Sequence, residues 1–407
     1  MSSSENVPSC NPPGFVGFLS GLAGSRLALT RTLLYYLAYV SLGLSVVSLG
    51  PTLAGLAQHT GSRLNEISFL FVARSLGYLL GSWLGGRLYD RARGHRLMSA
   101  AFLSMASMLA LAPLTSRLWA LTGVLLLLGF AEGSVDVGGN TLLIWVHGRR
   151  VGPFLNGLHF CFGIGAFLSP VIIAQAMLLS GDITWAYWAL ALLLLPAAAI
   201  LPRFSSPRHD AVEQRHGRDV PVPYTLVALI VLFFFLHVGA EAAYGGWVFS
   251  YATAQGVGNA IVAAYLTSAY WGAITVGRLL NIPIAARFSV NAILTGDLLG
   301  CLVSIGILIF FPSSLVALWV GTFGIGLAIA SLYPMTLCLA EQRMPMTGRV
   351  TGWLLIGSGS GMMVLPWLIG QVFESAGPPV TMWAIAVALL GALAVLAVIQ
   401  RRPISQQ

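Results

Sequence analysis

Long apolar runs dominate this sequence from residue 32 to residue 400. Each run is roughly 17 to 25 residues long, which is enough for a helix to cross about 30 Å of hydrocarbon. The composition agrees, because 57% of the residues are hydrophobic and only 8% are charged, whereas soluble proteins carry about 25% charged residues. We therefore expect an all-α membrane protein with twelve spans, near residues 32–57, 65–88, 97–113, 118–146, 152–178, 183–201, 223–252, 260–283, 291–311, 314–339, 349–372 and 380–399.

The basic residues indicate how the chain is oriented, because cytoplasmic loops of membrane proteins are enriched in them. If both termini are cytoplasmic, 17 of the 21 basic residues, all of them arginine, fall inside. Only Arg63 and Arg117 then fall outside, while Arg74 and Arg278 lie within spans. We expect a multi-pass protein of the cell membrane with both termini cytoplasmic. The arginines are scattered over short loops, so we expect no nucleic-acid partner.

The sequence contains none of the patterns that would indicate catalysis. We find no cluster of metal-ligand type, no hydrolytic triad and no P-loop lysine. We therefore expect neither an enzyme nor a resident cofactor or metal, and we exclude ATP-driven transport by this chain alone.

The chain repeats itself at an offset of about 195 residues, which aligns Gly50 with Gly245 and Gly77 with Gly272. At 196, "GIGAFLSPVIIAQ" lies over "GSGMMVLPWLIGQ". Two parallel six-helix halves are the build of transporters that bind substrate near the midplane, between the halves. We expect an N-terminal tail at 1–30, a six-helix bundle at 31–201, a central cytoplasmic loop at 202–222, a second six-helix bundle at 223–400 and a C-terminal tail at 401–407.

One loop motif resembles a family signature. "GGRLYDRARGHR", residues 85–96, resembles the signature that the major facilitator superfamily carries between its second and third helices, although Gly94 comes one position late. The resemblance implies the major facilitator fold, with twelve helices in two pseudo-symmetric bundles. It also implies a charge latch at the inner gate, formed by Gly86, Asp90 and Arg91. The alternative is a basic loop that only fixes the topology.

Four further motifs resemble the fucose permease group and the related sodium-dependent glucose transporters. The resemblance implies ion-coupled symport of a small polar solute, most simply a hexose sugar, by alternating access. The partners would then be that small molecule, a coupling proton or sodium ion and the lipid bilayer, with the protein functional as a monomer. A proton-coupled exporter of drugs or metabolites, working by antiport, and a nontransporting membrane sensor stay open as alternatives. The motifs are "SLGPTLAGLA" (48–57), "DVGGN" (136–140), "LNGLHFCFGIGAFLSP" (155–170) and "HVGAEAAYGGWVFSYA" (237–252).

Polar residues in the fourth span lie along one helix face. Glu132, Asp136 and Asn140 are spaced by four residues, and each ionised acid in hydrocarbon needs a partner, a proton or a water-filled cavity. The resembling group carries an acid four positions before an asparagine here, which implies that Asp136 is the ion-coupling residue. Glu132 is an additional ion-coupling candidate, and it is also the expected partner of Arg74 in the second span.

The remaining candidates suit a sugar, which offers hydroxyl groups and an apolar ring face. Asn156 and His159 share a face of the fifth span, where His159 could hydrogen-bond Asp136 or be structural. Aromatic plates could come from Trp247, Trp271 and Tyr270; the alternative for the tryptophans is a place that faces lipid or lies at the bilayer interface. We further expect Arg278 to pair with Asp297. The predicted substrate-binding residues are Asn140, Asn156, His159, Glu241, Trp247 and Trp271.

Overall fold

The computed structural model describes residues 26–207, 223–344 and 346–402. Over these residues it contains twelve helical spans that are long and apolar enough to cross a membrane. The expected all-α membrane fold is therefore confirmed. Most of the predicted 1–30 tail, positions 208–222 of the predicted central loop and the last five residues lie outside the described part of the chain.

The spans follow one another with short turns. The first half comprises α2 (Arg26–Val46), α3 (Leu49–Thr60), α4 (Leu64–Ile67), α5 (Phe69–Arg91), α6 (Gly94–Leu111), α7 (Leu118–His147), α8 (Gly152–Ser180) and α9 (Ile183–Ile200). The second half comprises α10 (Tyr224–Ala254), α11 (Ala260–Ala285), α12 (Val290–Phe310), α13 (Leu315–Ile329), α14 (Leu332–Arg343), α15 (Gly348–Ala376) and α16 (Val380–Arg401).

Two spans are each broken into two helices by a proline. Pro51 is the third residue of α3, and Pro334 is the third residue of α14. Proline has no N–H to donate and its ring clashes with the carbonyl four residues earlier. That carbonyl falls in the gap between α2 and α3 in one span and between α13 and α14 in the other. Each break therefore lies at the carbonyl that the proline leaves without its usual N–H donor.

The sequence repeat reappears as a repeated helix crossing. Gly165 on α8 lies so close to α2 that any side chain there would collide with the main-chain oxygen of Val40. Gly361 on α15 lies equally close to Phe235 on α10. The two glycines are equivalent in the repeat, and each permits two backbones to touch, as small residues do between membrane helices. The two bundles are thus built around the same contact.

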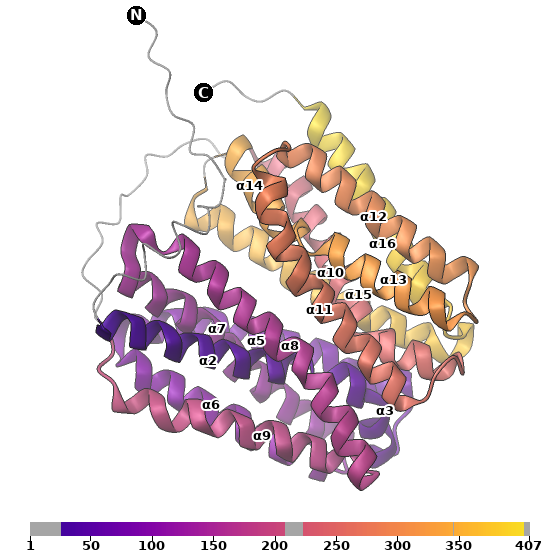
Figure 1. Cartoon of the computed structure of the whole chain (residues 1–407), viewed down its shortest axis with the longest axis horizontal. Helices are drawn as coiled ribbons and strands as arrows, with labels where there is room; N and C mark the ends of the chain where they lie inside the picture. The colour runs from indigo at the N-terminus through magenta and orange to yellow at the C-terminus, as the bar shows by residue number, and fades with distance from the viewer. Residues whose placement is uncertain (1–25, 208–222, 345, 403–407) are drawn as a thin grey trace, which may run out of the picture.

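The two halves lie side by side, one indigo to magenta and the other pink through orange to yellow (Figure 1). We call the end of the bundle that carries the α3–α4 turn the outer end, and the opposite end the inner end. Toward the outer end, α3 packs against α10 and α4 against α15. Gly50 lies against its repeat partner there, because a methyl group at Gly50 would be 2.8 Å from the main-chain oxygen of Gly245.

Hydrogen bonds also join the halves at the outer end. The Gln371 side chain donates to the main-chain oxygen of Asn65 at 2.8 Å. The Glu374 carboxylate accepts the main-chain N–H of Leu64 at 2.9 Å. These contacts, together with the glycine contact, close the outer end.

The halves separate toward the inner end. On α15, Gly359 faces Leu79 of α5. Nearer the outer end, Gly370 faces Ser68, the N-cap residue of α5. Continued inward, this antiparallel register would bring Gly352 opposite Gly86. A side chain at Gly352 would instead meet no atom within 4 Å. The space between the halves therefore opens toward the inner end, and we call this space the central cleft.

Candidate functional site

Arg74 and Glu132 form a buried ion pair, which confirms the predicted partner of this arginine. The guanidinium contacts the carboxylate twice, with Nη2 2.5 Å from Oε1 and Nε 2.9 Å from Oε2. The Ser45 hydroxyl donates to Oε1 at 2.5 Å, and Arg74 Nη2 donates to the Ser45 main-chain oxygen at 2.6 Å. The two charged residues are 7% and 1% exposed. In this conformation Glu132 is closed off from the central cleft, so its predicted coupling role gains no support.

Asp136 lies at the centre of a second polar cluster. Tyr39 donates to Oδ1 at 2.8 Å and Tyr78 donates to Oδ2 at 2.6 Å. The Asn140 amide donates to the Tyr39 hydroxyl at 2.7 Å, and its distance to Asp136 Oδ1 is 3.4 Å. Asp136 and Asn140 are half-buried, and Asp136 is close enough to Tyr333 of the second half for its charge to act there, so the cluster borders the central cleft. The predicted Asp136–Asn140 pair is thus brought together.

Sequence reasoning missed the two tyrosines that hold Asp136. Tyr78 follows Arg74 by four residues, so the helix places both on one face. Tyr39 belongs to the "YYLAY" run of the first span. A phenol that lies deep in an apolar helix usually finds a hydrogen-bond partner, and this was the available signal.

His159 and Asn156 lie on α8 and are exposed. The His159 ring meets the Tyr39 ring edge-on, with the centroids 5.9 Å apart. The expected hydrogen bond from His159 to Asp136 does not occur among the bonds found for the described residues. Tyr39 therefore links the imidazole to the Asp136 cluster.

Helix α11 of the second half lies beside His159 and the Asp136 cluster. It packs antiparallel to α8, where Gly163 touches the Thr275 side chain and Gly272 touches Phe167. His159 and Arg278 each lie one helical turn inward of the Gly163–Thr275 contact. The two side chains are therefore neighbours across the boundary between the halves.

Glu241 on α10 completes the cluster. It is half-buried, and its main-chain oxygen accepts the Tyr270 hydroxyl at 3.0 Å. Arg278 is close enough for its charge to act on both Glu241 and His159. Polar groups from α7, α8, α10 and α11 thus surround the central cleft.

The expected pairing of Arg278 with Asp297 is wrong. Asp297 accepts a short hydrogen bond from the Ser331 hydroxyl at the start of α14. Helix α12, which carries Asp297, packs mainly on α13 and α16, whereas the face of α11 that carries Arg278 is turned to α8. The two side chains therefore belong to different contacts.

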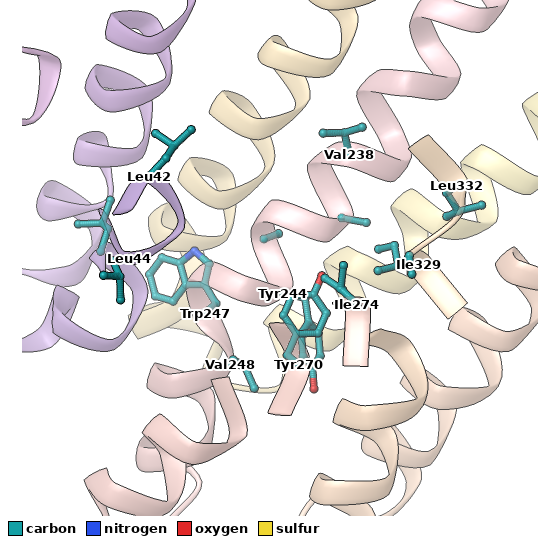
Figure 2. Packing of buried hydrophobic residues seen from close by; sticks show 14 of the residues in the cluster. Leu42, Leu44, Val238, Tyr244, Trp247, Val248, Tyr270, Ile274, Ile329 and Leu332 are labelled. Carbon is teal, nitrogen blue, oxygen red and sulfur yellow. The ribbon is translucent and has the colours of Figure 1, made fainter. Parts of the chain in front are cut away.

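Trp247 does not line the central cleft in this structure, which corrects the prediction for this residue. It is fully buried, and its indole N–H donates to the main-chain oxygen of Pro366 at 2.9 Å. The ring stacks on Phe373 at a centroid distance of 4.9 Å and lies 6.1 Å from Phe71 of the other half. Figure 2 shows Trp247 among the packed side chains. The residue helps to close the outer end because both halves press on its ring.

Trp271 lies on α11 and is half-buried. It packs against Tyr270 and Phe162, with ring centroids at 5.4 Å and 6.5 Å. Its indole N–H makes no hydrogen bond to any of the residues that the structure describes. Trp271 thus stays a candidate for contact with a substrate at the boundary of the halves.

The predicted latch residues lie at the inner end of α5. Gly86 is half-buried, whereas Asp90 and Arg91 are exposed. The ion pairs found over residues 26–207, 223–344 and 346–402 do not include Asp90. A latch that holds the inner gate shut would be released in a conformation that is open at this end, so its role stays a prediction.

The late glycine of the signature, Gly94, lies against Leu142, because a methyl group there would be 2.6 Å from Leu142 Cδ2. Gly94 is followed by His95, whose Nδ1 is 2.9 Å from the main-chain oxygen of Phe204. Its Nε2 is 2.7 Å from the Tyr35 hydroxyl. His95 thereby ties the start of α6 to α2 and to the segment that follows α9.

The charges around the central cleft do not cancel. Asp136 and Glu241 are acids and Arg278 is a base, while Arg74 and Glu132 neutralise each other in their own pair. With all three ionised, the cleft carries one net negative charge. Within the described part of the chain, no group of three or more His, Cys, Asp or Glu side chains could hold a metal ion. One small cation would balance the net charge of the cleft.

Comparison with known proteins agrees with this arrangement. The sequence profile of the Major Facilitator Superfamily matches residues 35–354. Sodium-dependent glucose transporter 1A of Mus musculus is 30% identical over 82% of this chain and 88% of its own length. Major facilitator superfamily domain-containing protein 4A of Homo sapiens is 28% identical over 89% of this chain and 90% of its own length.

A solved structure shows the same fold. A mutant of the nucleoside transporter NupG superposes with a TM-score of 0.73 over 92% of this chain and 100% of its own, at 12% sequence identity. At that identity the likeness concerns the arrangement of the helices alone.

Proposed function

This chain belongs to the Major Facilitator Superfamily and is a multi-pass membrane transporter, and we propose that it carries a hexose sugar in symport with a cation. The observation that carries the proposal is the cleft lined by Asp136, Asn140, His159, Glu241 and Arg278 from both halves. Substrate bound between two rocking halves is the general arrangement for alternating access. The structure would then be the conformation that is open at the inner end.

The chemistry of the cleft supports a hydroxylated substrate. Asn140 and Asn156 offer amide groups, Glu241 accepts hydrogen bonds and His159 can donate or accept. Trp271 adds an aromatic face close to these groups. The sodium-dependent glucose transporters with which the chain shares about 30% identity support the same substrate class.

The net charge of the cleft supports a cation as the coupling species. A single negative charge in a site of low dielectric is costly, and one proton or one sodium ion removes it. We propose that Asp136 binds this ion, because its carboxylate borders the cleft while that of Glu132 is enclosed. Together with the Asp136 carboxylate, the hydroxyls of Tyr39 and Tyr78 provide oxygen atoms of the kind that a hard cation prefers.

We further propose that the protein lies in the cell membrane with its inner end toward the cytoplasm. The distribution of the arginines supports this orientation. A cysteine at Ala286 on the inner end should resist an impermeant thiol reagent in intact cells, whereas one at Ser62 on the outer end should react. The opposite pattern would reverse the orientation.

Transport by the purified full-length protein in liposomes tests the function. A panel of labelled hexoses is offered with a sodium gradient or a proton gradient imposed separately. We expect one of the hexoses to accumulate under one of the two gradients. If no hexose moves under either gradient, while a cationic drug is transported in exchange for protons, the protein is an exporter and the proposal is wrong.

A further inference from the structure

Arg278 is the charged residue in the central cleft whose guanidinium has no fixed partner. The two ion pairs found among the described residues are Arg74–Glu132 and His59–Asp182. No hydrogen bond from the Arg278 side chain to any of those residues is found either. An unpaired guanidinium within the membrane is costly, so it is retained where it meets water or a ligand.

The position of Arg278 is fixed by the packing of α11. Trp271, Thr275 and Arg278 follow a spacing of four and three residues, so they share one face of this helix. Thr275 on that face touches Gly163 of the first half. Arg278 therefore points to the boundary of the halves, one turn inward of the place where α8 and α11 touch.

The charged and polar groups around the guanidinium are close enough to feel its charge but form no ion pair with it. Glu241 feels the charge of Arg278 but makes no ion pair with it within 4 Å. His159, on the opposite half, is exposed and also feels this charge. The Tyr333 side chain of α14 completes the surroundings and is half-buried. A small polar molecule held between Arg278, Glu241 and His159 would therefore contact both halves.

We propose that Arg278 is a substrate-binding residue that selects the sugar: its N–H groups donate hydrogen bonds to two neighbouring hydroxyl oxygens, while Glu241 accepts a hydrogen bond from a hydroxyl group of the same ring. This inference rests on the proposed sugar transport. The planar guanidinium presents five donors in a fixed fork, whereas the ammonium of lysine is a compact point charge. The direction of the hydroxyl groups on the ring then decides which epimer satisfies both side chains.

The test measures equilibrium binding of labelled D-glucose to the purified full-length protein in nanodiscs at fixed sodium concentration and pH. Arg278→Gln should weaken binding at least tenfold, and Arg278→Lys should weaken it less but change the ranking of epimers. Arg287→Gln is the matched control, because Arg287 is an exposed arginine at the inner end of the same hairpin. It should bind sugar as the parent does.

A series of deoxyglucoses separates contact from structural damage. If Arg278 contacts a hydroxyl group, the deoxyglucose that lacks this group should bind the parent weakly. The Arg278→Gln substitution should then reduce its affinity only slightly further. A purely structural role would weaken every sugar of the series by the same factor, and this would overturn the proposal. Unchanged glucose binding by Arg278→Gln would overturn it as well.

A labelling experiment distinguishes this failure from failure of the proposed function. In a cysteine-free background, Arg278→Cys should react with a water-soluble thiol reagent, whereas Val276→Cys should not. Val276 is on the same helix but lines an apolar groove with Phe167 and Trp319. If the parent binds no sugar, both the proposed function and sugar selection by Arg278 are wrong. Labelling of Arg278→Cys would still show that this residue lies in the cleft. An unreactive Arg278→Cys would show that the placement itself is wrong.

Discussion

The Arg74 guanidinium and the Glu132 carboxylate meet through two parallel contacts, at 2.5 Å and 2.9 Å, inside the first half of the transporter. The geometry is the two-pronged pairing that arginine makes with carboxylates. Ser45 satisfies both partners further, so neither charge depends on the central cleft. The pair therefore fixes α5 to α7, and the net charge of the cleft is left to Asp136, Glu241 and Arg278.

Removing one member of this pair should destabilise the protein strongly. Arg74→Met leaves the Glu132 carboxylate buried without compensation, which typically costs about 3 to 5 kcal/mol. The double variant Arg74→Met with Glu132→Leu should recover most of this stability, since it leaves no buried charge. Unfolding in a denaturing detergent, followed by circular dichroism, measures both. A single variant as stable as the parent would show that the pair contributes little.

The contact of Gly50 with Gly245 should control the outer gate. Gly50→Val places a side chain where a methyl carbon would already lie 2.8 Å from the Gly245 oxygen, so the closed outer end should be disfavoured. Ser68→Cys reports the change, because Ser68 is fully buried under Gly370 in this conformation. Its labelling by a thiol reagent should rise severalfold in the Gly50→Val background.

The control for the outer gate is Gly123→Val, since a side chain at Gly123 would meet no atom within 4 Å. It should leave the labelling of Ser68→Cys unchanged. Equal labelling in the two glycine variants would mean that the glycine contact does not hold the outer end closed.

Asp90 should stabilise the conformation in which the inner end is closed, which is not the conformation of this structure. It is exposed at the open inner end, so Asp90→Asn should leave the stability of the present conformation within about 0.5 kcal/mol, as for most surface substitutions. If Asp90 forms the latch, the closed inner gate loses a charge contact and transport slows with nearly unchanged substrate affinity. Uptake kinetics in liposomes decide this, and a variant with the parent's maximal rate would make the motif merely topogenic.

Much of the fold could be predicted because hydrocarbon demands long apolar helices. The predicted span 118–146 corresponds to the observed helix Leu118–His147, and the other spans agree within a few residues apart from the N-terminal one. The α2–α3 break could have been anticipated from Pro51, because proline lacks the backbone N–H that continues a helix. A prediction from hydropathy alone does not include this effect.

The candidate site was less predictable. The spacing of residues along the sequence shows which of them share a helix face, but not which helix packs against that face. The face that carries Asp136 and Asn140 was readable, whereas Tyr39 and Tyr78 come from other helices. Arg278 was assigned to Asp297 because the opposite helix was unknown. Trp247 was misplaced for a further reason, since its burial depends on which end of the transporter is closed.

The central claim is that Asp136 couples the movement of the substrate to that of the ion. Tyr39 and Tyr78 hold its carboxylate at the border of the cleft, with 2.8 Å and 2.6 Å contacts, and an amide of similar shape can keep the cluster without carrying the charge. Asp136→Asn should therefore remove ion binding while sparing the path of the sugar.

The most direct measurement compares two assays on the same liposomes that contain Asp136→Asn: exchange of labelled sugar for unlabelled sugar with no ion gradient, and accumulation driven by the gradient that drives the parent. We predict exchange within a few fold of the parent's rate and no accumulation above equilibrium. If Asp136→Asn concentrates sugar as well as the parent does, Asp136 is not the coupling residue.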